Sequence, residues 1–164
     1  MKGMLPGTER VSRWVMGAVL TASALGMAQA QQRAEKACDA DHRCQAIRNL
    51  FQRYESPLGK LALVFVRAAD ANGLDWRLLP AISIVETTGG RFGTPGNIFG
   101  WNSGKTSFRT VEEGIHFVAE RFKKSPIYAG KKALAILDRY NPARKAYPPK
   151  VTRVMKELAS DAVE

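Results

Sequence analysis

Glu86 has the strongest local reason of any carboxylate in this sequence to act as an acid. It follows an apolar stretch at residues 78–85 and directly precedes Thr87-Thr88-Gly89-Gly90. A buried helix ending here would surround the carboxyl with apolar groups and place it at the negative end of the helix dipole. Both effects raise a carboxyl pKa, as is required of a general acid that protonates a glycosidic oxygen. The alternative is a surface glutamate at a frayed helix end, or one paired with Arg91.

Other kinds of catalytic chemistry are poorly represented. The chain has two histidines, His42 and His116, and two cysteines that are six residues apart, a spacing that does not fit a usual Cys/His zinc cluster. It contains no G-x-S-x-G nucleophile motif and neither of the glycine-rich phosphate-binding motifs. We therefore expect no metal and no cofactor, and we expect any enzymatic chemistry to rest on carboxylates.

The elements that would position Glu86 are helices, because signals for strands are almost absent. Ser56 with Pro57 is a helix-start pair, Gly73 is a typical helix stop, and Thr110 with Glu113 forms a capping box. About six helices are expected: one ending before Ser56, then Pro57 to Gly73, Asp75 to Glu86 with a kink or delayed start at Pro80, Thr110 to Ser125, residues 131–140, and a last one after Pro149. The sequence therefore predicts an all-α fold.

A glycine-rich segment at 89–104 interrupts the helical pattern. It also contains Phe92, Ile98, Phe99 and Trp101, which are unfavourable residues to leave in water. Because long irregular segments within compact domains are usually functional or disordered, we expect an ordered loop that lines a cleft.

Residues 1–30 are typical of a secretory signal peptide. Lys2, Arg10 and Arg13 precede an apolar stretch, and Ala28-Gln29-Ala30 fits the small-x-small cleavage pattern. The stretch is too short for a stable membrane anchor, although an uncleaved membrane helix is the alternative. The whole chain has a net charge of +10. Cleavage of this segment would remove three basic residues and one acidic residue, so the mature chain would keep 22 basic and 14 acidic residues. In an exported protein this surface favours anionic cell-wall polymers over nucleic acid.

Cys38 and Cys44 are expected to form a disulfide in an oxidising compartment. A continuous helix would hold their Cα atoms about 9 Å apart, which exceeds the reach of a disulfide. Either the chain turns near residues 39–41 or the thiols stay free, and we favour the turn. We expect residues 31–56 to form an N-terminal helical extension and residues 57–164 the main domain.

Two segments of the sequence resemble a known family. Residues 78–87, LLPAISIVET, are followed by a glycine-rich turn and Asn97-Ile98-Phe99-Gly100-Trp101. This pattern resembles the glucosaminidase domains of the lysozyme-like superfamily, which are related to bacterial lytic transglycosylases. Phe108, residues 112–115, Tyr140-Asn141-Pro142 and Tyr147 match later segments, so the resemblance covers about 70–160. It implies a compact lysozyme-like helical domain that acts on peptidoglycan.

The resemblance also implies roles for individual residues. Glu86 falls on the family's catalytic acid, and Tyr147 on a tyrosine that the family places beside that acid. Substrate binding is implied for Asn97, Phe99, Trp101, Tyr140 and Asn141, although core packing or turn formation are alternatives for Asn97, Trp101 and Tyr147. The sequence departs from the family at Thr87-Thr88, where Ser and Gly are commoner.

A second catalytic carboxylate is not evident. Inverting glycosidases place a base roughly 6.5–9.5 Å from the acid, and retaining ones place a nucleophile about 5–5.5 Å away. Glu112 and Glu113 are candidates by sequence order, but both fit the start of a helix, and Asp138 is expected to face solvent. The substrate's own acetamido or hydroxymethyl group could take that place, and the sequence does not choose.

Three functional hypotheses follow. The leading one is an exported glycosidase, with an N-acetylglucosaminidase favoured, that cleaves the β-1,4 glycan backbone of peptidoglycan with Glu86 as the general acid. The second is a cell-wall-binding or secretion-accessory domain with the same fold and little activity. The third is a basic helical binding protein whose glycine-rich loop holds a small ligand.

Overall fold

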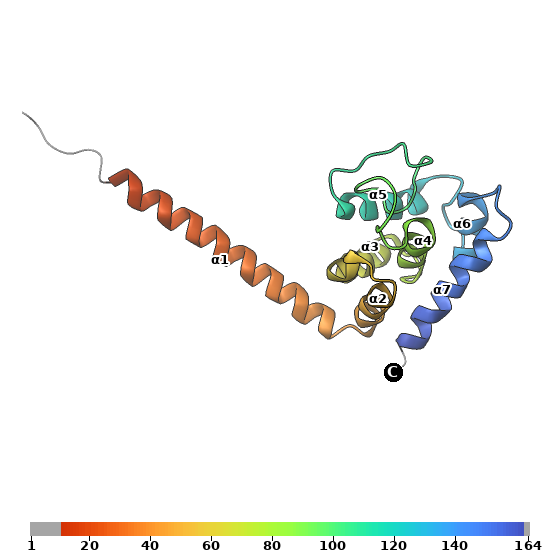
Figure 1. Ribbon diagram of the computed structural model, residues 1–164, viewed down its shortest axis with the longest axis horizontal. Helices are drawn as coiled ribbons and strands as arrows, with labels where there is room; N and C mark the ends of the chain where they lie inside the picture. Colours follow the sequence, from red (N-terminus) through yellow and green to blue (C-terminus); the bar gives the residue numbers. More distant parts are fainter. Residues whose placement is uncertain (1–10, 163–164) are drawn as a thin grey trace, which may run out of the picture. The chain divides into compact units, whose positions relative to one another are not determined.

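The computed structural model describes residues 11–162, which contain helices and no strand. The order is α1 (Val11–Asp39), α2 (His42–Arg53), the 3-10 helix η1 (Pro57–Leu61), α3 (Ala62–Asn72), α4 (Leu78–Thr87), α5 (Val111–Lys124), α6 (Ala133–Tyr140) and α7 (Tyr147–Asp161) (Figure 1). The predicted all-α class is confirmed.

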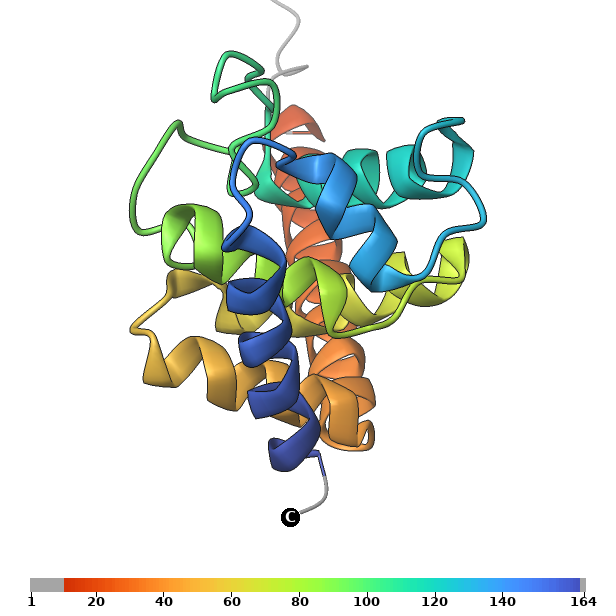
Figure 2. The ribbon, with the colours of Figure 1, turned by 90° about the vertical axis from the view of Figure 1, so that its right-hand side faces the viewer.

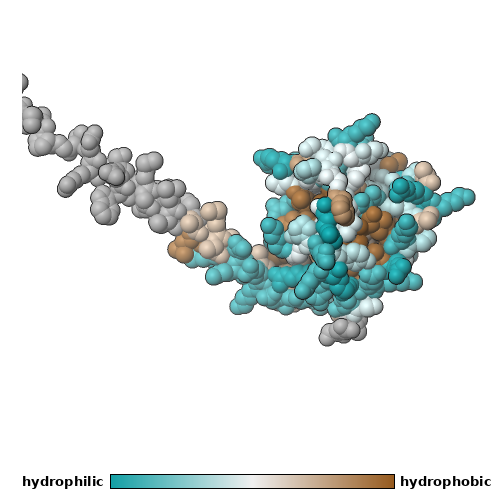
Figure 3. Space-filling view, viewed as in Figure 1, coloured by the Kyte–Doolittle hydropathy of each residue, from teal (hydrophilic) through white to brown (hydrophobic). Residues whose placement is uncertain are grey.

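The chain divides into two compact units, and the second begins at Cys38. In the first unit, α1 carries exposed apolar side chains at Leu25 and Met27 and is polar after them (Figure 3). Lys2 and Arg10 of the predicted signal peptide lie outside the described residues. No helix in the described range 11–162 is both long enough and apolar enough to cross a membrane.

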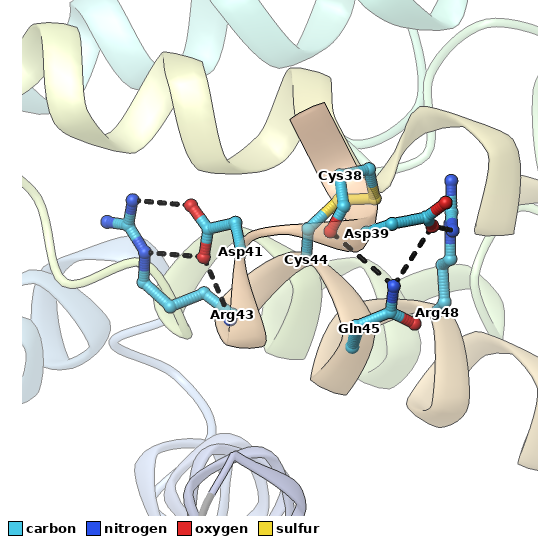
Figure 4. Close-up of a disulfide and its surroundings, with 7 residues drawn as sticks. All are labelled: Cys38, Asp39, Asp41, Arg43, Cys44, Gln45 and Arg48. Carbon is cyan, nitrogen blue, oxygen red and sulfur yellow. Dashed lines mark hydrogen bonds and ion pairs between the residues drawn. A yellow bond between two sulfur atoms is a disulfide. The ribbon is translucent and has the colours of Figure 1, made fainter. Parts of the chain in front are cut away.

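The second unit starts with the expected turn and disulfide. Helix α1 ends at Asp39 and α2 begins at His42, which brings the Cα atoms of Cys38 and Cys44 to 5.2 Å and allows the bond between them (Figure 4). Asp41 caps α2 by accepting a hydrogen bond from the backbone N–H of Arg43 at 2.9 Å. The Arg43 guanidinium beside Asp41 lowers the pKa of that carboxyl.

The expected boundary between an N-terminal extension and the main domain at residue 57 differs from the structural one. Helix α2 packs against α3 and α7, and its residues Ile47, Leu50 and Phe51 are fully buried in the common core. The domain core therefore needs α2, and the residues from Cys38 to Arg53 belong to it.

Helix α4 is a central element of this unit, as its apolar sequence predicts. It packs against α7 and α3, while α5 packs against α3 and α6 against α7 (Figure 2). Its first seven residues, Leu78 to Ile84, are all buried. The helix that carries Glu86 is therefore fixed by packing along most of its length.

Of the two effects expected at Pro80, a kink or a delayed start, the structure shows a start later than a cap at Asp75 would give. Helix α4 begins at Leu78, so Pro80 lies in its first turn, where a backbone N–H would have no partner within the helix. Asp75 accepts a hydrogen bond from the backbone N–H of Arg77 at 3.0 Å, which closes a turn before the helix and does not cap it.

Two predicted caps hold the ends of the candidate loop. Thr110 caps α5 by accepting from the backbone N–H of Glu113 at 3.1 Å. Ser56 caps η1, and its hydroxyl also donates to the Gly89 carbonyl at 2.6 Å. A Cβ at Gly89 would lie 2.5 Å from the Ser56 Oγ, so this approach requires glycine. The chain leaving α4 is thereby tied to the start of η1.

Candidate active site

Glu86 lies in the last turn of α4 and faces the glycine-rich loop. Its carboxylate approaches the backbone at Gly100, where a Cβ would lie 3.1 Å from the Glu86 Oε2. Gly100 has a φ of 60°, in the left-handed region that favours glycine. The loop therefore comes close to the acid at a position where a side chain would crowd it.

Burial raises the pKa of the Glu86 carboxyl above its ordinary value. The Tyr147 hydroxyl and the positive charge of Arg144 both act in the opposite direction, and burial has the larger effect. This agrees with the prediction made from the position of Glu86 at the end of an apolar helix. The carboxyl thus retains its proton to a higher pH than an exposed glutamate does.

Tyr147, the first residue of α7, lies beside Glu86 and not in the solvent. It is 2% exposed, and its ring stacks on that of Tyr140 with centroids 5.9 Å apart. The hydroxyl is buried without a partner that meets hydrogen-bond geometry, yet it is close enough to Glu86 to lower the pKa of that carboxyl. Burial and the negative charge of Glu86 raise the pKa of Tyr147 itself. The Tyr147 hydroxyl therefore stays neutral beside the Glu86 carboxyl.

A cleft of about 670 Å³ opens over the Glu86 carboxylate. Four of the predicted site residues line it, together with six others; the lining consists of Glu86, Gly100, Trp101, Asn102, Ser103, Thr106, Tyr128, Tyr140, Asn141 and Arg144. Among these residues Glu86 is the single carboxylate and Arg144 the single cation.

Trp101 and Tyr140 form the aromatic part of the cleft wall. Their ring centroids lie 5.9 Å apart, and the Trp101 indole also meets Phe117 edge-on at 5.7 Å. The Tyr140 hydroxyl donates to the Phe99 carbonyl at 2.5 Å, and burial raises the pKa of this tyrosine. Trp101 is partly exposed, so its indole is held by packing and still accessible from the cleft.

Asn97 does not line the cleft, which corrects the expected substrate contact. It is 1% exposed, and its side-chain amide donates to the carbonyls of Trp101 at 3.0 Å and Thr106 at 2.8 Å. Its Oδ1 accepts from the Trp101 backbone N–H at 2.9 Å. The amide is thus fully used in folding the loop, which was the alternative interpretation of this residue.

Phe99 also requires correction as a substrate-binding residue. Its side chain is completely buried in the hydrophobic core, so it has no face to offer a sugar ring. Its backbone carbonyl accepts the hydrogen bond from Tyr140, which ties the loop to α6. Apolar residues in a loop can serve the core or the cleft equally well, and nothing in their spacing distinguishes the two.

The departure from the family pattern at Thr87 and Thr88 has a structural account. The Thr87 hydroxyl lies 2.8 Å from the Ile98 carbonyl and accepts from the Gly90 backbone N–H at 2.9 Å, so it retains the hydroxyl that serine would supply. Thr88 ends α4 with a φ of 53°, a conformation in which glycine costs less. The substitution strains the helix end and leaves Glu86 in place.

Several cleft residues were not found from the sequence. Asn102 and Ser103 line part of the cleft. Both have a φ of 54°, in the left-handed region that residues other than glycine rarely adopt. Tyr128 and Arg144 come from connections between helices, where no periodicity marks them. The sequence shows that residue 144 is a basic residue, but its position beside Glu86 depends on tertiary packing.

The candidates for a second carboxylate lie elsewhere. Glu112 and Asp138 are exposed, and Glu113 accepts a hydrogen bond from the Arg109 backbone N–H at 3.0 Å at the start of α5. None of the three lines the cleft. Across the described side chains, no group of three or more His, Cys, Asp or Glu is arranged to hold a metal ion.

Comparison of the chain with protein-family models, curated proteins and solved structures found no match.

Proposed function

We propose that this chain is an exported enzyme that cleaves the β-1,4 glycan backbone of peptidoglycan, with Glu86 as its general acid. The observation that carries the proposal is the Glu86 carboxyl, whose pKa is raised by burial and which lines a cleft large enough for sugar rings. Export rests on the predicted signal peptide at residues 1–30, and peptidoglycan on the resemblance to glucosaminidase domains.

The side chains around Glu86 suit a carbohydrate. Asn102, Ser103, Thr106 and Asn141 offer amide and hydroxyl groups to sugar hydroxyls, while Trp101 offers an aromatic face. Such mixed walls bind rings that are polar at the edge and apolar on the face. The same walls argue against the third hypothesis of a small ligand held by the glycine-rich loop alone, because most of the lining lies outside that loop.

The single carboxylate of the cleft favours a mechanism in which the substrate supplies the second group. In the first step, the Glu86 proton passes to the glycosidic oxygen as the bond from that oxygen to the anomeric carbon breaks. The acetamido oxygen or the hydroxymethyl oxygen of the same sugar then bonds to the anomeric carbon. If the hydroxymethyl group attacks, its proton returns to Glu86 and an anhydro sugar forms; if the acetamido group attacks, water later opens the ring with Glu86 as base.

Digestion of purified peptidoglycan tests the proposal. We expect Glu86→Gln to lower the rate of muropeptide release by about 100- to 10,000-fold, the usual contribution of a general acid. Glu112→Gln is the matched control, since it removes an exposed carboxylate outside the cleft and should leave the rate unchanged. Equal and negligible release by the unaltered protein and Glu86→Gln would refute the proposal in favour of a wall-binding domain.

Mass analysis of the products identifies the bond. A reducing N-acetylglucosamine end marks a glucosaminidase, which we favour, and a reducing N-acetylmuramic acid end marks a muramidase. An anhydro sugar marks a lytic transglycosylase. Loss of activity in Glu112→Gln would instead identify that residue as a second acid and overturn the mechanism with one carboxylate.

A further inference from the structure

A second, smaller pocket adjoins the cleft and is strongly basic. It has a volume of about 380 Å³ and is lined by Val85, Arg144, Lys145, Ala146, Tyr147 and Lys150. We call it the basic side pocket. Three of its six lining residues are cationic and none is acidic.

Arg144 joins the basic side pocket to the cleft, because it lines both. The pocket also begins one residue from the acid, since Val85 directly precedes Glu86 in α4. Tyr147 lies beside the Glu86 carboxylate and contributes to the pocket wall. A substituent on a sugar bound over Glu86 therefore has a short path into the pocket.

The three cations are available to a ligand. Within the described part of the chain, Arg144, Lys145 and Lys150 form no salt bridge, whereas many other basic residues do. All three are exposed. Their charges are gathered on one side of the candidate active site, and the lining of the pocket itself contains no acidic residue.

Side chains, not backbone groups, must bind an anion here. The pocket lies at the start of α7, where helices usually offer free N–H groups to anions. However, Pro148 and Pro149 have no N–H, and the Tyr147 N–H already donates to the Arg144 carbonyl at 2.8 Å. The remaining wall, from Val85, Ala146 and Tyr147, is largely apolar. A carboxylate on a short aliphatic arm matches this combination of an apolar wall and a cationic rim.

We propose that the basic side pocket binds a carboxylate carried by the glycan strand and thereby selects anionic over neutral β-1,4 glycans. This inference rests on the proposed glycosidase function. Two substituents of peptidoglycan have this chemistry, the carboxylates of the stem peptide and the lactyl carboxylate that is free once the peptide is removed. Recognition of either one orients the strand, because the pocket lies to one side of Glu86.

The test compares three forms of one glycan: intact strands with stem peptides, strands whose peptides have been removed by an amidase, and intact strands whose carboxylates have been amidated with carbodiimide and ammonia. For the unaltered protein we expect kcat/KM to be about fivefold higher on carboxylate-bearing strands than on amidated ones, since one exposed ion pair contributes up to about fivefold. A preference for intact strands over amidated ones identifies the carboxylates of the stem peptide; a preference that is seen only with amidase-treated strands identifies the lactyl carboxylate.

The variants separate charge recognition from effects on Glu86. Lys145→Gln with Lys150→Gln should raise KM on carboxylate-bearing strands and bring the ratio between substrates close to one. Arg144→Gln should do the same and should also move the pH profile on every substrate, because Arg144 lowers the pKa of Glu86. The control removes three charges from another groove, with Lys123→Gln, Lys131→Gln and Lys132→Gln.

An unchanged preference in the Lys145/Lys150 double variant, or an equal loss of preference in the control, would overturn the inference while leaving the glycosidase proposal intact. Sedimentation of the Glu86→Gln protein with intact and amidated sacculi gives a second readout that needs no cleavage. If the unaltered protein cleaves nothing, the proposed function fails, and this binding preference still decides whether the pocket recognises carboxylates.

Discussion

Replacement of Asn97 by alanine should destabilise the protein by about 3 kcal/mol, with each lost hydrogen bond contributing about 1 kcal/mol. The side chain makes three hydrogen bonds, two to the carbonyls of Trp101 and Thr106 and one from the Trp101 backbone N–H. Because Asn97 is 1% exposed, water does not readily replace them. Domains of this kind have an unfolding free energy of about 5–15 kcal/mol, so the variant should still fold.

Urea denaturation followed by far-UV circular dichroism measures this loss directly. Asn72→Ala is the matched control, since the Asn72 amide makes one hydrogen bond, to the Ala68 carbonyl at 2.8 Å, near the end of α3. We expect the control to lose about 1 kcal/mol or less. Asn97→Asp retains the acceptor for Trp101 and turns a carboxylate toward two carbonyls, so its stability should fall as the pH rises and that carboxyl ionises.

The same variants distinguish a folding role from substrate contact. If Asn97→Ala is no less stable than Asn72→Ala but releases far less muropeptide, the Asn97 amide contacts substrate and the structural role assigned to it in the loop is wrong. If stability and activity fall together, and activity recovers under stabilising conditions, the amide acts through the position of Trp101.

Three further changes test the surroundings of the acid and the start of the domain. Gly100→Ala should lose about 1–2 kcal/mol of stability through its left-handed backbone, and also activity, because its Cβ would crowd the Glu86 carboxylate. Tyr147→Phe removes a group that lowers the pKa of Glu86, so that pKa should rise further and the high-pH limb of the rate profile should move to higher pH. Replacing Cys38 and Cys44 with serine should lower the unfolding free energy by about 2 kcal/mol, as expected for a loop of this size.

Each change has its own control. Gly73→Ala has the same backbone strain, with a φ of 63°, but no atom within 4 Å of the new Cβ, so equal loss of activity in both glycine variants would contradict the contact with Glu86. An unmoved or lowered high-pH limb in Tyr147→Phe would contradict the assigned influence of the hydroxyl. For the disulfide, chemical reduction of the unaltered protein should reproduce the loss seen in the serine variant; unchanged stability in both would contradict its role.

Most of the helices were predictable because their signals are local, although the single helix expected from Pro57 to Gly73 is the 3-10 helix η1 followed by α3. Thr110 and Glu113 are three residues apart, and the preference that makes them a cap operates over that distance. The position of Glu86 was predictable for a similar reason, since burial and the helix end can both be recognised in the ten residues of α4.

The cleft walls were less predictable because they depend on contacts between distant segments. Phe99 and Trp101 are two residues apart in one irregular loop, yet one is buried and the other borders the cleft. Arg144 reaches Glu86 only because α7 packs against α4, a contact between segments about sixty residues apart. The periodicity of apolar residues along the sequence does not predict contacts between segments so far apart.

The aromatic cluster around Trp101 also allows binding in the cleft to be followed by the fluorescence of the Trp101 indole. The indole lies 5.9 Å from the Tyr140 ring, close enough to receive its excitation energy, and it borders the same cavity as Glu86. A sugar ring that covers the indole takes it out of water and shifts its emission to shorter wavelengths. Trp76 packs against the core and does not line the cleft, so a Trp76→Phe protein reduces the background. If the proposed function holds, combining this change with Glu86→Gln turns the protein into a fluorescent sensor whose signal follows glycan occupancy at equilibrium.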